Sequence, residues 1–227
     1  MSELHRVAIV PARGGSKRIP RKNIKPFHGV PLIERTLVTL LESELFGDVV
    51  VSTDDDEIAA VARNAGASVP FMRHASLADD HTPTVPVILD TLDRLSESEM
   101  SIGEVAVVYP AAVFTTPEDL ATSLELLHQT SVDQVFSACE YEAPIQRAWR
   151  RIADGTAEWL HPEHANTRSQ DLQPRYYDAG QFYWWAPQTA ESLRKGNPIR
   201  RAMYLMPRWR VQDIDTPEDW EMAEKLY

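Results

Sequence analysis

The sequence predicts a three-layer α/β fold, in which a mostly parallel sheet is flanked by helices on both faces. Short runs rich in β-branched and apolar residues alternate along the chain with amphipathic segments at helical spacing. Strands and helices that alternate in this way are joined by right-handed crossovers, which place parallel strands side by side. A chain of 227 residues with 43% hydrophobic residues can bury one sizeable core. We therefore expect residues 1–227 to form one domain.

The first elements follow from apolar patterning and from the residues that begin helices. Residues 6–10 form a β-branched apolar run, which is typical of a strand buried on both faces. Pro31 suits a helix N-terminus, and apolar residues from Ile33 to Leu45 follow at helical spacing. After a second strand, the acidic residues 54–57 favour the dipole of the next helix.

The same alternation continues to the end of the chain. Thr116-Pro117 and Thr216-Pro217 are typical helix starts. The predicted strands are 6–10, 48–53, 105–109, 132–139, 180–185 and 202–206. The predicted helices are 31–46, 58–65, 84–97, 117–128, 188–195 and 216–226.

Between about residues 140 and 177 the alternation breaks. Pro144, a turn signal at Asp154-Gly155 and the segment His161-Pro162-Glu163 indicate an excursion from the sheet. Such an arm often serves dimerisation or forms a lid over a site.

Composition excludes several classes of protein. The formal net charge of −11 argues against a nonspecific nucleic-acid binder, which must offer a basic surface to phosphates. No stretch approaches the roughly 20 apolar residues of a membrane span, and the polar start does not fit a signal peptide. The single cysteine, Cys139, lies in an apolar run and is interpreted as a buried residue without chemistry. We expect a cytoplasmic protein with no nucleic-acid or membrane partner.

A basic, glycine-containing loop, residues 11–23, follows the first predicted strand. It holds five basic residues, two adjacent glycines and a serine. Gly14 and Gly15 would let the backbone approach a ligand, while Arg13, Lys17 and Lys22 would neutralise a polyphosphate. The loop also lies at the carboxyl end of a strand, where open α/β folds bind ligands. These features predict a phosphate site, and the alternative is an exposed basic turn.

The spacing within this loop disfavours the common phosphate-binding enzymes. It fits neither the G-x-x-x-x-G-K-[ST] of a P-loop nor the G-x-G-x-x-G of a dinucleotide site, which argues against kinases, ordinary ATPases and nicotinamide enzymes. The seven histidines are scattered, so no zinc site is predicted.

Residues 9–23 resemble the signature of the CMP-sugar synthetases, the acylneuraminate cytidylyltransferase family. The resemblance implies a Rossmann-like fold of the nucleotide-diphospho-sugar transferase type, CTP as the nucleotide, and catalytic roles for Arg13, Lys17 and Lys22. The loop residues expected to bind the nucleotide are Ala12, Arg13, Gly14, Gly15, Ser16, Lys22 and Asn23.

Residues 73–82 resemble the segment with which this family recognises cytidine. Arg73, Thr82 and Thr84 stand where the family would read the base and the ribose. Taken alone, Arg73 would fit a solvated surface charge.

Two aspartates near the C-terminus, Asp213 and Asp215, are the predicted metal ligands. Nucleotidyl transfer needs a divalent cation, because the α-phosphorus and the leaving pyrophosphate are negatively charged. A spacing of two on an extended segment points both carboxylates to one side. The family has an equivalent Asp-x-Asp, which implies Mg²⁺ here and a catalytic role for Asp215. Capping of the last helix by Asp215 or Thr216 is the alternative.

A second acidic run, residues 54–56, also follows a strand and competes as a metal site. We interpret it as the first turn of a helix, because its charges match the helix dipole.

The second substrate is assigned to residues 168–184. An arginine can bind a carboxylate through two parallel hydrogen bonds, and aromatic rings can pack on a sugar, so Arg168 is chosen for the acid group. For the aromatic residues, ordinary strand core is the alternative. The residues expected to shape the pocket are Gln170, Gln181, Phe182 and Tyr183.

Within the family, residues 168–172 and 178–184 look most like the pseudaminic acid branch. The chain departs from the family pattern at 109–114 and at Tyr177. The resemblance implies transfer of CMP from CTP to the anomeric C2 hydroxyl of a nine-carbon acidic sugar by a homodimer. Alternatives are N-acetylneuraminic or legionaminic acid as the sugar, another nucleotide such as UTP, and a catalytically silent nucleotide-binding regulator.

Overall fold

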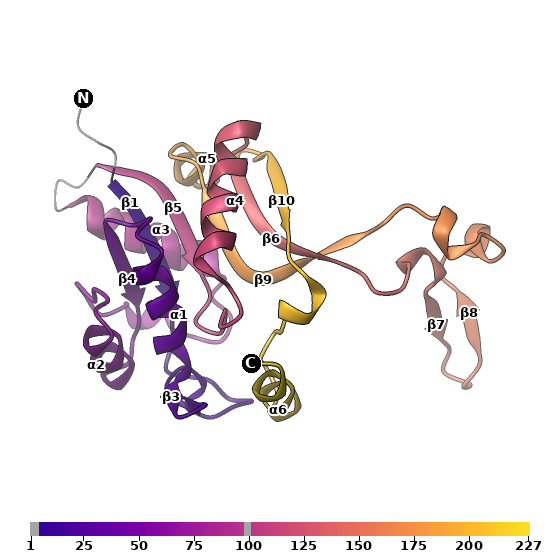
Figure 1. The fold of residues 1–227 in the computed structure, drawn as a ribbon, viewed down its shortest axis with the longest axis horizontal. Helices are drawn as coiled ribbons and strands as arrows, with labels where there is room; N and C mark the ends of the chain where they lie inside the picture. The colour runs from indigo at the N-terminus through magenta and orange to yellow at the C-terminus, as the bar shows by residue number, and fades with distance from the viewer. Residues whose placement is uncertain (1–4, 98–100) are drawn as a thin grey trace.

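The computed structural model describes residues 5–97 and 101–227. Within these ranges, six strands form one sheet in the order β10-β6-β9-β5-β1-β4. Figure 1 shows the helices packed against this sheet and an arm projecting from its side. The predicted α/β fold with a mostly parallel sheet is confirmed.

The predicted elements are found in the predicted order, with shifted ends. The strands of the main sheet are β1 (His5–Pro11), β4 (Asp48–Ser52), β5 (Ile102–Val108), β6 (Gln134–Glu140), β9 (Tyr176–Trp185) and β10 (Arg201–Leu205). The helices are α1 (Leu32–Glu42), α2 (Asp56–Asn64), α3 (Thr84–Ser96), α4 (Pro117–Thr130), α5 (Thr189–Arg194) and α6 (Pro217–Leu226). Short strands β2 (Pro26–Phe27) and β3 (Val30–Pro31) pair with each other. Helix α1 ends before the predicted residue 46, because Glu44 has a φ of 54° that a right-handed helix does not allow.

The core lies on both faces of the sheet. On one face, Ala8 and Val10 of β1 belong to the cluster formed with α1, α2 and α4. On the other face, Val7 and Ile9 pack with side chains of α3. Strand β1 is therefore buried on both sides, as its composition predicts. A third cluster, which includes Trp220 of α6, joins the C-terminal helix to the region after β1.

Strand β9 pairs antiparallel with both of its neighbours, β5 and β6. Its direction follows from the path of the chain, which leaves β6, passes through the arm and returns along β6. The sequence pattern predicts the strand but not this direction, because apolar alternation is the same in both directions. Strand β9 also begins at Tyr176, earlier than the predicted residue 180.

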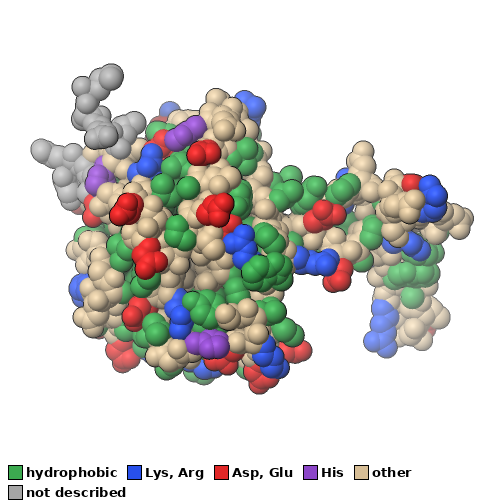
Figure 2. Space-filling view, in the orientation of Figure 1, with side chains coloured by type: hydrophobic (Ala, Val, Ile, Leu, Met, Phe, Trp, Pro, Cys, Tyr) green, Lys and Arg blue, Asp and Glu red, His purple; other side chains and the backbone are tan. Residues whose placement is uncertain are grey.

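The arm lies between β6 and β9, where the alternation breaks in the sequence. It contains the antiparallel strands β7 (Trp149–Arg151) and β8 (Ala157–Trp159), and the rings of Trp149 and Trp159 lie 3.8 Å apart between centroids. Figure 2 shows the arm standing clear of the body. Trp149 is 54% exposed and Leu160 is 49% exposed, so the arm carries uncovered apolar surface.

No helix in the described part of the chain combines the length and the apolar character that crossing a membrane requires.

Candidate active site

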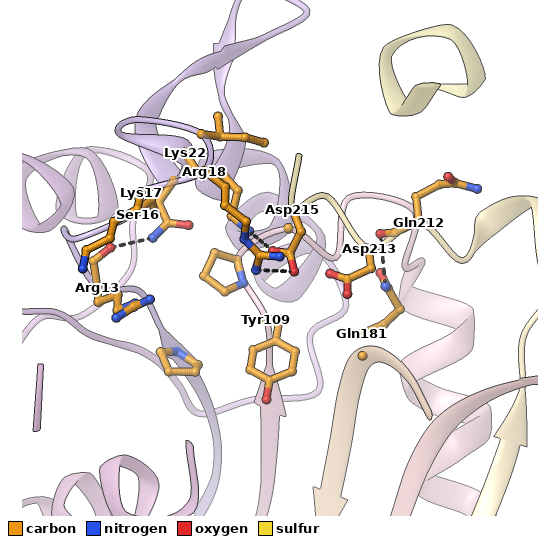
Figure 3. Close-up of a pocket in the computed structure, with 16 residues that line it drawn as sticks. Arg13, Ser16, Lys17, Arg18, Lys22, Tyr109, Gln181, Gln212, Asp213 and Asp215 are labelled. Carbon is orange, nitrogen blue, oxygen red and sulfur yellow. Dashed lines mark hydrogen bonds and ion pairs between the residues drawn. The ribbon is translucent and has the colours of Figure 1, made fainter. Parts of the chain in front are cut away.

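Two adjoining cavities open at the edge of the sheet where β1 and β5 end. The first has a volume of about 270 Å³ and the second of about 240 Å³. Both are lined by Pro11, Arg13 and Tyr109, so they are compartments of one site. Figure 3 shows the first cavity, in which the loop 11–23 faces the segment that precedes α6. The second cavity lies between the same loop and the residues that lead into α3.

The loop 11–23 is held in place from within and by neighbouring elements. The N–H of Ala12 donates to the Ser52 carbonyl oxygen over 2.9 Å, which continues the pairing of β1 with β4. The buried Asn23 donates from Nδ2 to the carbonyl oxygen of Arg13 over 3.0 Å. Arg21, which has a φ of 56°, forms ion pairs with Asp55 and Glu57 at the start of α2. Asn23 thus orders the loop backbone in the structure.

The two glycines of the loop have different reasons to be there. A Cβ on Gly14 would lie 2.6 Å from Oδ2 of Asp55, so a larger residue would collide with α2. The N–H of Gly14 already donates to Oδ1 of Asp54 over 3.0 Å. Gly15 has open space around it. Gly14 therefore closely approaches a carboxylate of the protein, and its approach to a ligand stays a prediction.

The acidic run 54–56 begins helix α2, as predicted. The Asp55 carboxylate accepts from the backbone N–H groups of Glu57 and Ile58, each over 3.0 Å, and so caps the helix. The hydrogen bond from Arg21 outweighs burial and lowers the pKa of Asp55, which stays ionised in this role.

Arg13 and Lys17 both contact one carboxylate, that of Asp80. Nη1 of Arg13 donates to Oδ1 of Asp80 over 2.6 Å and to the carbonyl oxygen of Asp79 over 3.0 Å, and Lys17 pairs with Oδ2 of Asp80. Lys17 and then Arg13 lower the pKa of Asp80. Asp80 thus satisfies two of the cations that the sequence assigns to a polyphosphate.

The two predicted metal ligands line the first cavity together. Oδ1 of Asp215 accepts from Nζ of Lys22 over 3.1 Å, and Oδ2 accepts from Arg18 over 2.6 Å. Lys22 also donates to the carbonyl oxygen of Ile214 over 2.7 Å. Burial, followed by the charge of Asp215, raises the pKa of Asp213. A partly buried carboxylate whose charged form is disfavoured gains from a nearby cation.

This donor set fits Mg²⁺ but not a cation that needs an all-protein cage. Within residues 5–97 and 101–227, no cluster of three or more His, Cys, Asp or Glu side chains could hold a metal ion. Magnesium is bound through one or two carboxylates together with water and substrate phosphates, whereas structural zinc takes four protein ligands. Asp213 and Asp215 suit the first arrangement.

The residues chosen for cytidine recognition meet in the second cavity. Arg73, Thr82 and Thr84 all line it. Arg73 is only 8% exposed and donates from Nε to Oγ of Ser52 over 3.2 Å, so the interpretation as a solvated surface charge is wrong. Burial lowers the pKa of Arg73. A buried guanidinium beside a cavity costs free energy that an anionic or hydrogen-bonding ligand can offset.

Of the predicted sugar residues, only Gln181 lines the first cavity. It is 2% exposed, its Nε2 donates to the Ala179 carbonyl oxygen over 2.9 Å, and its Oε1 has no partner among the described residues. Phe182 points to the other face of β9 and is fully buried in the core, as alternation along a strand requires. Tyr183 lines neither cavity; its ring packs against that of Tyr109, and its hydroxyl donates to Asp178. The assignment of Phe182 to the pocket is therefore corrected to a core role.

Arg168 and Gln170 lie on the exposed arm, away from both cavities of this chain. Arg168 is 72% exposed and donates to both carboxylate oxygens of Asp171, over 2.7 and 3.1 Å. The prediction placed Arg168 in the pocket because a guanidinium can bind the acid group of the sugar, and Gln170 because it lies in the same segment, 168–184. Their closeness in sequence to Gln181 did not show that the arm places them away from the cavities.

The sequence and the fold of this chain were compared with those of known proteins. Residues 7–172 match the family model described as Cytidylyltransferase. The chain belongs to the cytidylyltransferase family. Pseudaminic acid cytidylyltransferase of Campylobacter jejuni is 37% identical to this family member over 224 residues, which cover 97% of the chain and 95% of the relative. CMP-N,N'-diacetyllegionaminic acid synthase of Legionella pneumophila is 33% identical over 227 residues, with 97% and 95% covered. N-acylneuraminate cytidylyltransferase A of Danio rerio is 32% identical over 227 residues, 97% of the chain and 50% of the relative.

Two solved structures share the fold of this cytidylyltransferase. A CMP:2-keto-3-deoxy-manno-octonic acid synthetase in complex with CTP has a TM-score of 0.70 at 16% identity and covers 98% of both chains. A 4-diphosphocytidyl-2C-methyl-D-erythritol synthase from Anaerococcus prevotii has a TM-score of 0.61 at 12% identity, with 98% and 97% covered. The nucleotidyltransferase type of Rossmann-like fold is thereby confirmed.

Several residues that line the candidate site were not predicted from the sequence. Tyr109 follows a predicted strand, and Gln212 precedes the predicted aspartate pair. Because ligands bind at the carboxyl ends of strands in such folds, Tyr109 could have been predicted. Arg18 belongs to the basic loop, but nothing in the sequence separated it from the other basic residues there as a neighbour of Asp215. Asp80 could not be found, because its pairing with Arg13 joins residues far apart in sequence.

A buried ion pair fixes the segment that carries the two aspartates. Arg210 lies in the short 3₁₀ helix Arg208–Arg210 and donates to both oxygens of Asp119, over 2.5 and 2.9 Å. Asp119 is 2% exposed, caps α4 with Thr116 and accepts from Tyr204 over 2.8 Å. Burial disfavours its charged form, but these hydrogen bonds outweigh burial and lower the pKa of Asp119. The pair thus ties the segment before Asp213 to the body.

The variant Asp119→Asn is expected to lose about 3 kcal/mol of unfolding free energy at pH 7, because it leaves the Arg210 charge without its carboxylate. A carboxylate whose pKa is lower in the folded state stabilises the fold at pH values above its pKa in the unfolded chain, about 3.9. This contribution to stability disappears as the pH falls through the lower pKa of the folded state. Urea unfolding should therefore show a full difference from wild type at pH 7 and a narrowing difference below about pH 4. Asp93→Asn, at an exposed pair with Arg194, is the matched control. Equal stability of Asp119→Asn and wild type at pH 7 would contradict the expectation.

Proposed function

We propose that this cytidylyltransferase transfers CMP from CTP to the anomeric C2 hydroxyl of a nine-carbon acidic sugar, with release of pyrophosphate. One observation carries the proposal: two cavities meet at Arg13, and one of them holds a carboxylate pair beside basic residues while the other holds a buried arginine and two threonines. A transferase that joins two substrates needs two such compartments with one shared boundary.

The chemistry of the linings supports one placement of the substrates. The second cavity offers Arg73, Thr82 and Thr84 to the base and ribose of CTP. Arg13 and Lys17 adjoin it and can neutralise the triphosphate once they exchange Asp80 for phosphate oxygens. The part of the first cavity lined by Lys17, Lys22 and the aspartate pair then takes the triphosphate, and the part lined by Gln181 takes the sugar.

Asp213 and Asp215 would hold Mg²⁺ in this arrangement. When bound, the cation supplies positive charge to the phosphate oxygens and orients them. Lys22 and Arg18 hold the Asp215 carboxylate from two sides and so fix its position in the cavity. Catalysis rests on positioning and on charge neutralisation, and the chain supplies both through groups fixed before the substrates arrive.

Pseudaminic acid is the proposed sugar. The support is the relatives that bear this name at 37% and 36% identity over nearly the whole chain. Residues 168–172 and 178–184 add to it, since they look most like that branch. N-acetylneuraminic and legionaminic acids are the alternatives, supported by relatives at 33% and 32% identity.

We propose further that the protein is a homodimer. The exposed Trp149 and Leu160 of the arm would be covered by a second copy. Arg168 and Gln170 would then lie at the boundary between two copies. Light scattering of the purified chain should give twice the mass of one chain, and a monomer mass would contradict this arrangement.

The test of the function is incubation with CTP, Mg²⁺ and, separately, pseudaminic, legionaminic and N-acetylneuraminic acids, followed by mass analysis. A CMP-sugar is expected with pseudaminic acid, and UTP in place of CTP should give no product. Product formation only with another of these acids would transfer the assignment to that sugar. CTP binding without metal-dependent turnover of any sugar would favour the silent regulator.

A further inference from the structure

Tyr109 stands at the boundary between the two cavities. It follows β5 directly, and its N–H donates to the carbonyl oxygen of Gln181 over 3.0 Å. Its side chain lines both cavities, a property that it shares with Pro11 and Arg13. In Figure 3 its ring lies between Arg13 on one side and Asp213 with Gln181 on the other.

The ring of Tyr109 is braced from two elements. Its hydroxyl and Oγ1 of Thr84, at the start of α3, are 3.0 Å apart in a hydrogen bond. Its ring meets that of Tyr183 edge-on, with 5.7 Å between centroids and 82° between planes. Tyr183 is held in turn by Asp178, whose two oxygens lie 2.9 and 3.0 Å from its hydroxyl. A ring fixed in this way can act as a wall between two ligands.

The position of this wall matters because of the chemistry on either side. With the nucleoside in the second cavity and the sugar in the first, the α-phosphorus has to lie where the cavities meet. Arg13 supplies positive charge there, while Pro11 and the Tyr109 ring supply apolar surface. A transferase needs such surface, because water can attack the same phosphorus.

We propose that Tyr109 sets the place where the sugar hydroxyl meets the α-phosphorus and keeps water away from it. The inference rests on the proposed function. Without the ring, water would attack in place of the sugar. A bond then forms between the water oxygen and the α-phosphorus, and the bond from that phosphorus to the oxygen bridging the α- and β-phosphates breaks. The products are CMP and pyrophosphate, and the protons of water pass to the solvent.

The variants Tyr109→Ala and Tyr109→Phe separate the ring from the hydroxyl. Removal of the ring joins the cavities, so formation of CMP-sugar is expected to fall about 10²-fold while free CMP becomes the main nucleotide product. Tyr109→Phe keeps the wall but loses the bond to Thr84. It should keep the wild-type product ratio and raise the KM of CTP about fivefold, because Thr84 lines the nucleotide cavity.

Reactions run in ¹⁸O-labelled water identify the source of the CMP. Attack of water on the α-phosphorus places the label in the phosphate of CMP. Breakdown of a CMP-sugar at its anomeric carbon instead places the label in the sugar. Mass analysis therefore distinguishes loss of the wall from decay of the product.

Tyr227→Phe is the matched control, since it removes a tyrosine hydroxyl that accepts from Arg35 over 2.9 Å near the C-terminus. It should behave as wild type. Tyr109→Leu, which keeps a shorter apolar side chain, replaces the alanine variant if circular dichroism shows that the latter does not fold. Slower turnover with no labelled CMP and unchanged KM values would overturn the inference. Absence of any CMP-sugar from the wild-type protein would instead refute the proposed function.

Discussion

The variant Asp215→Ala is expected to lower kcat about 10³-fold while the KM for CTP stays within about threefold of wild type. Asp215 lines the first cavity, where it is held by Lys22 and Arg18. Loss of this carboxylate leaves Asp213 as the remaining predicted ligand and weakens the cation site. The two released cations still attract the triphosphate, so nucleotide binding survives while the chemical step fails.

Steady-state release of pyrophosphate over a range of Mg²⁺ concentrations checks this expectation. The variant should need more Mg²⁺ than wild type, and chelation with EDTA should stop the wild-type reaction. Asp56→Ala, at an exposed carboxylate in the first turn of α2, controls for the change in net charge. Wild-type turnover by Asp215→Ala would refute its assignment as a metal ligand.

The variant Arg13→Ala is expected to lower kcat/KM for CTP about 10²- to 10³-fold. Arg13 is the one basic side chain that the described part of the chain places in both cavities. The loop should keep its shape, because Asn23 bonds the backbone carbonyl of Arg13 rather than its side chain. The lost ion pair with Asp80 is exposed, so the Tm should not change measurably.

Arg13→Lys should recover part of the lost rate, since it restores the charge without the planar two-pronged donor. Lys195→Ala removes a positive charge from an exposed position beside α5 and serves as the control. A full rate for Arg13→Ala, measured as pyrophosphate release with saturating sugar, would show that Arg13 does not contact the reacting phosphates.

Local patterns of the sequence were enough to predict the layers of the fold. The two-sided burial of β1 follows from its β-branched run, and the start of α2 at Asp55 follows from acidic residues before an apolar period. These features depend on residues that are close in sequence, so hydrophobic periodicity and helix-capping preferences are enough to predict them. The loop 11–23 follows the end of β1, where the sequence predicts a ligand site. Asp213 and Asp215 line the same cavity, but they lie in an irregular segment between the 3₁₀ helix Arg208–Arg210 and α6 and not at the predicted strand end. Their roles stay predictions.

What the sequence did not show depends on contacts between distant residues. Phe182 and Gln181 are adjacent, yet one enters the core and the other the cavity, and the choice of face depends on pairing with β5 and β6. Arg168 lies on the arm, whose range the broken alternation predicts, but the sequence did not show whether the arm covers the cavities or leaves them. The side chain of Tyr109 is positioned by a hydrogen bond with Thr84 of α3 and by ring packing on Tyr183 of β9.

The pairing of Asp80 with Arg13 and Lys17 has a consequence for which anions the site accepts. An anion that binds Arg13 and Lys17 must replace the Asp80 carboxylate, and it gains only the difference between the two interactions, which is small for an exposed pair. A singly charged anion repeats what Asp80 already provides and has no advantage over it. A triphosphate brings several charges on one molecule and can displace the carboxylate. If the loop binds CTP as proposed, this exchange favours a nucleoside triphosphate over small, singly charged anions.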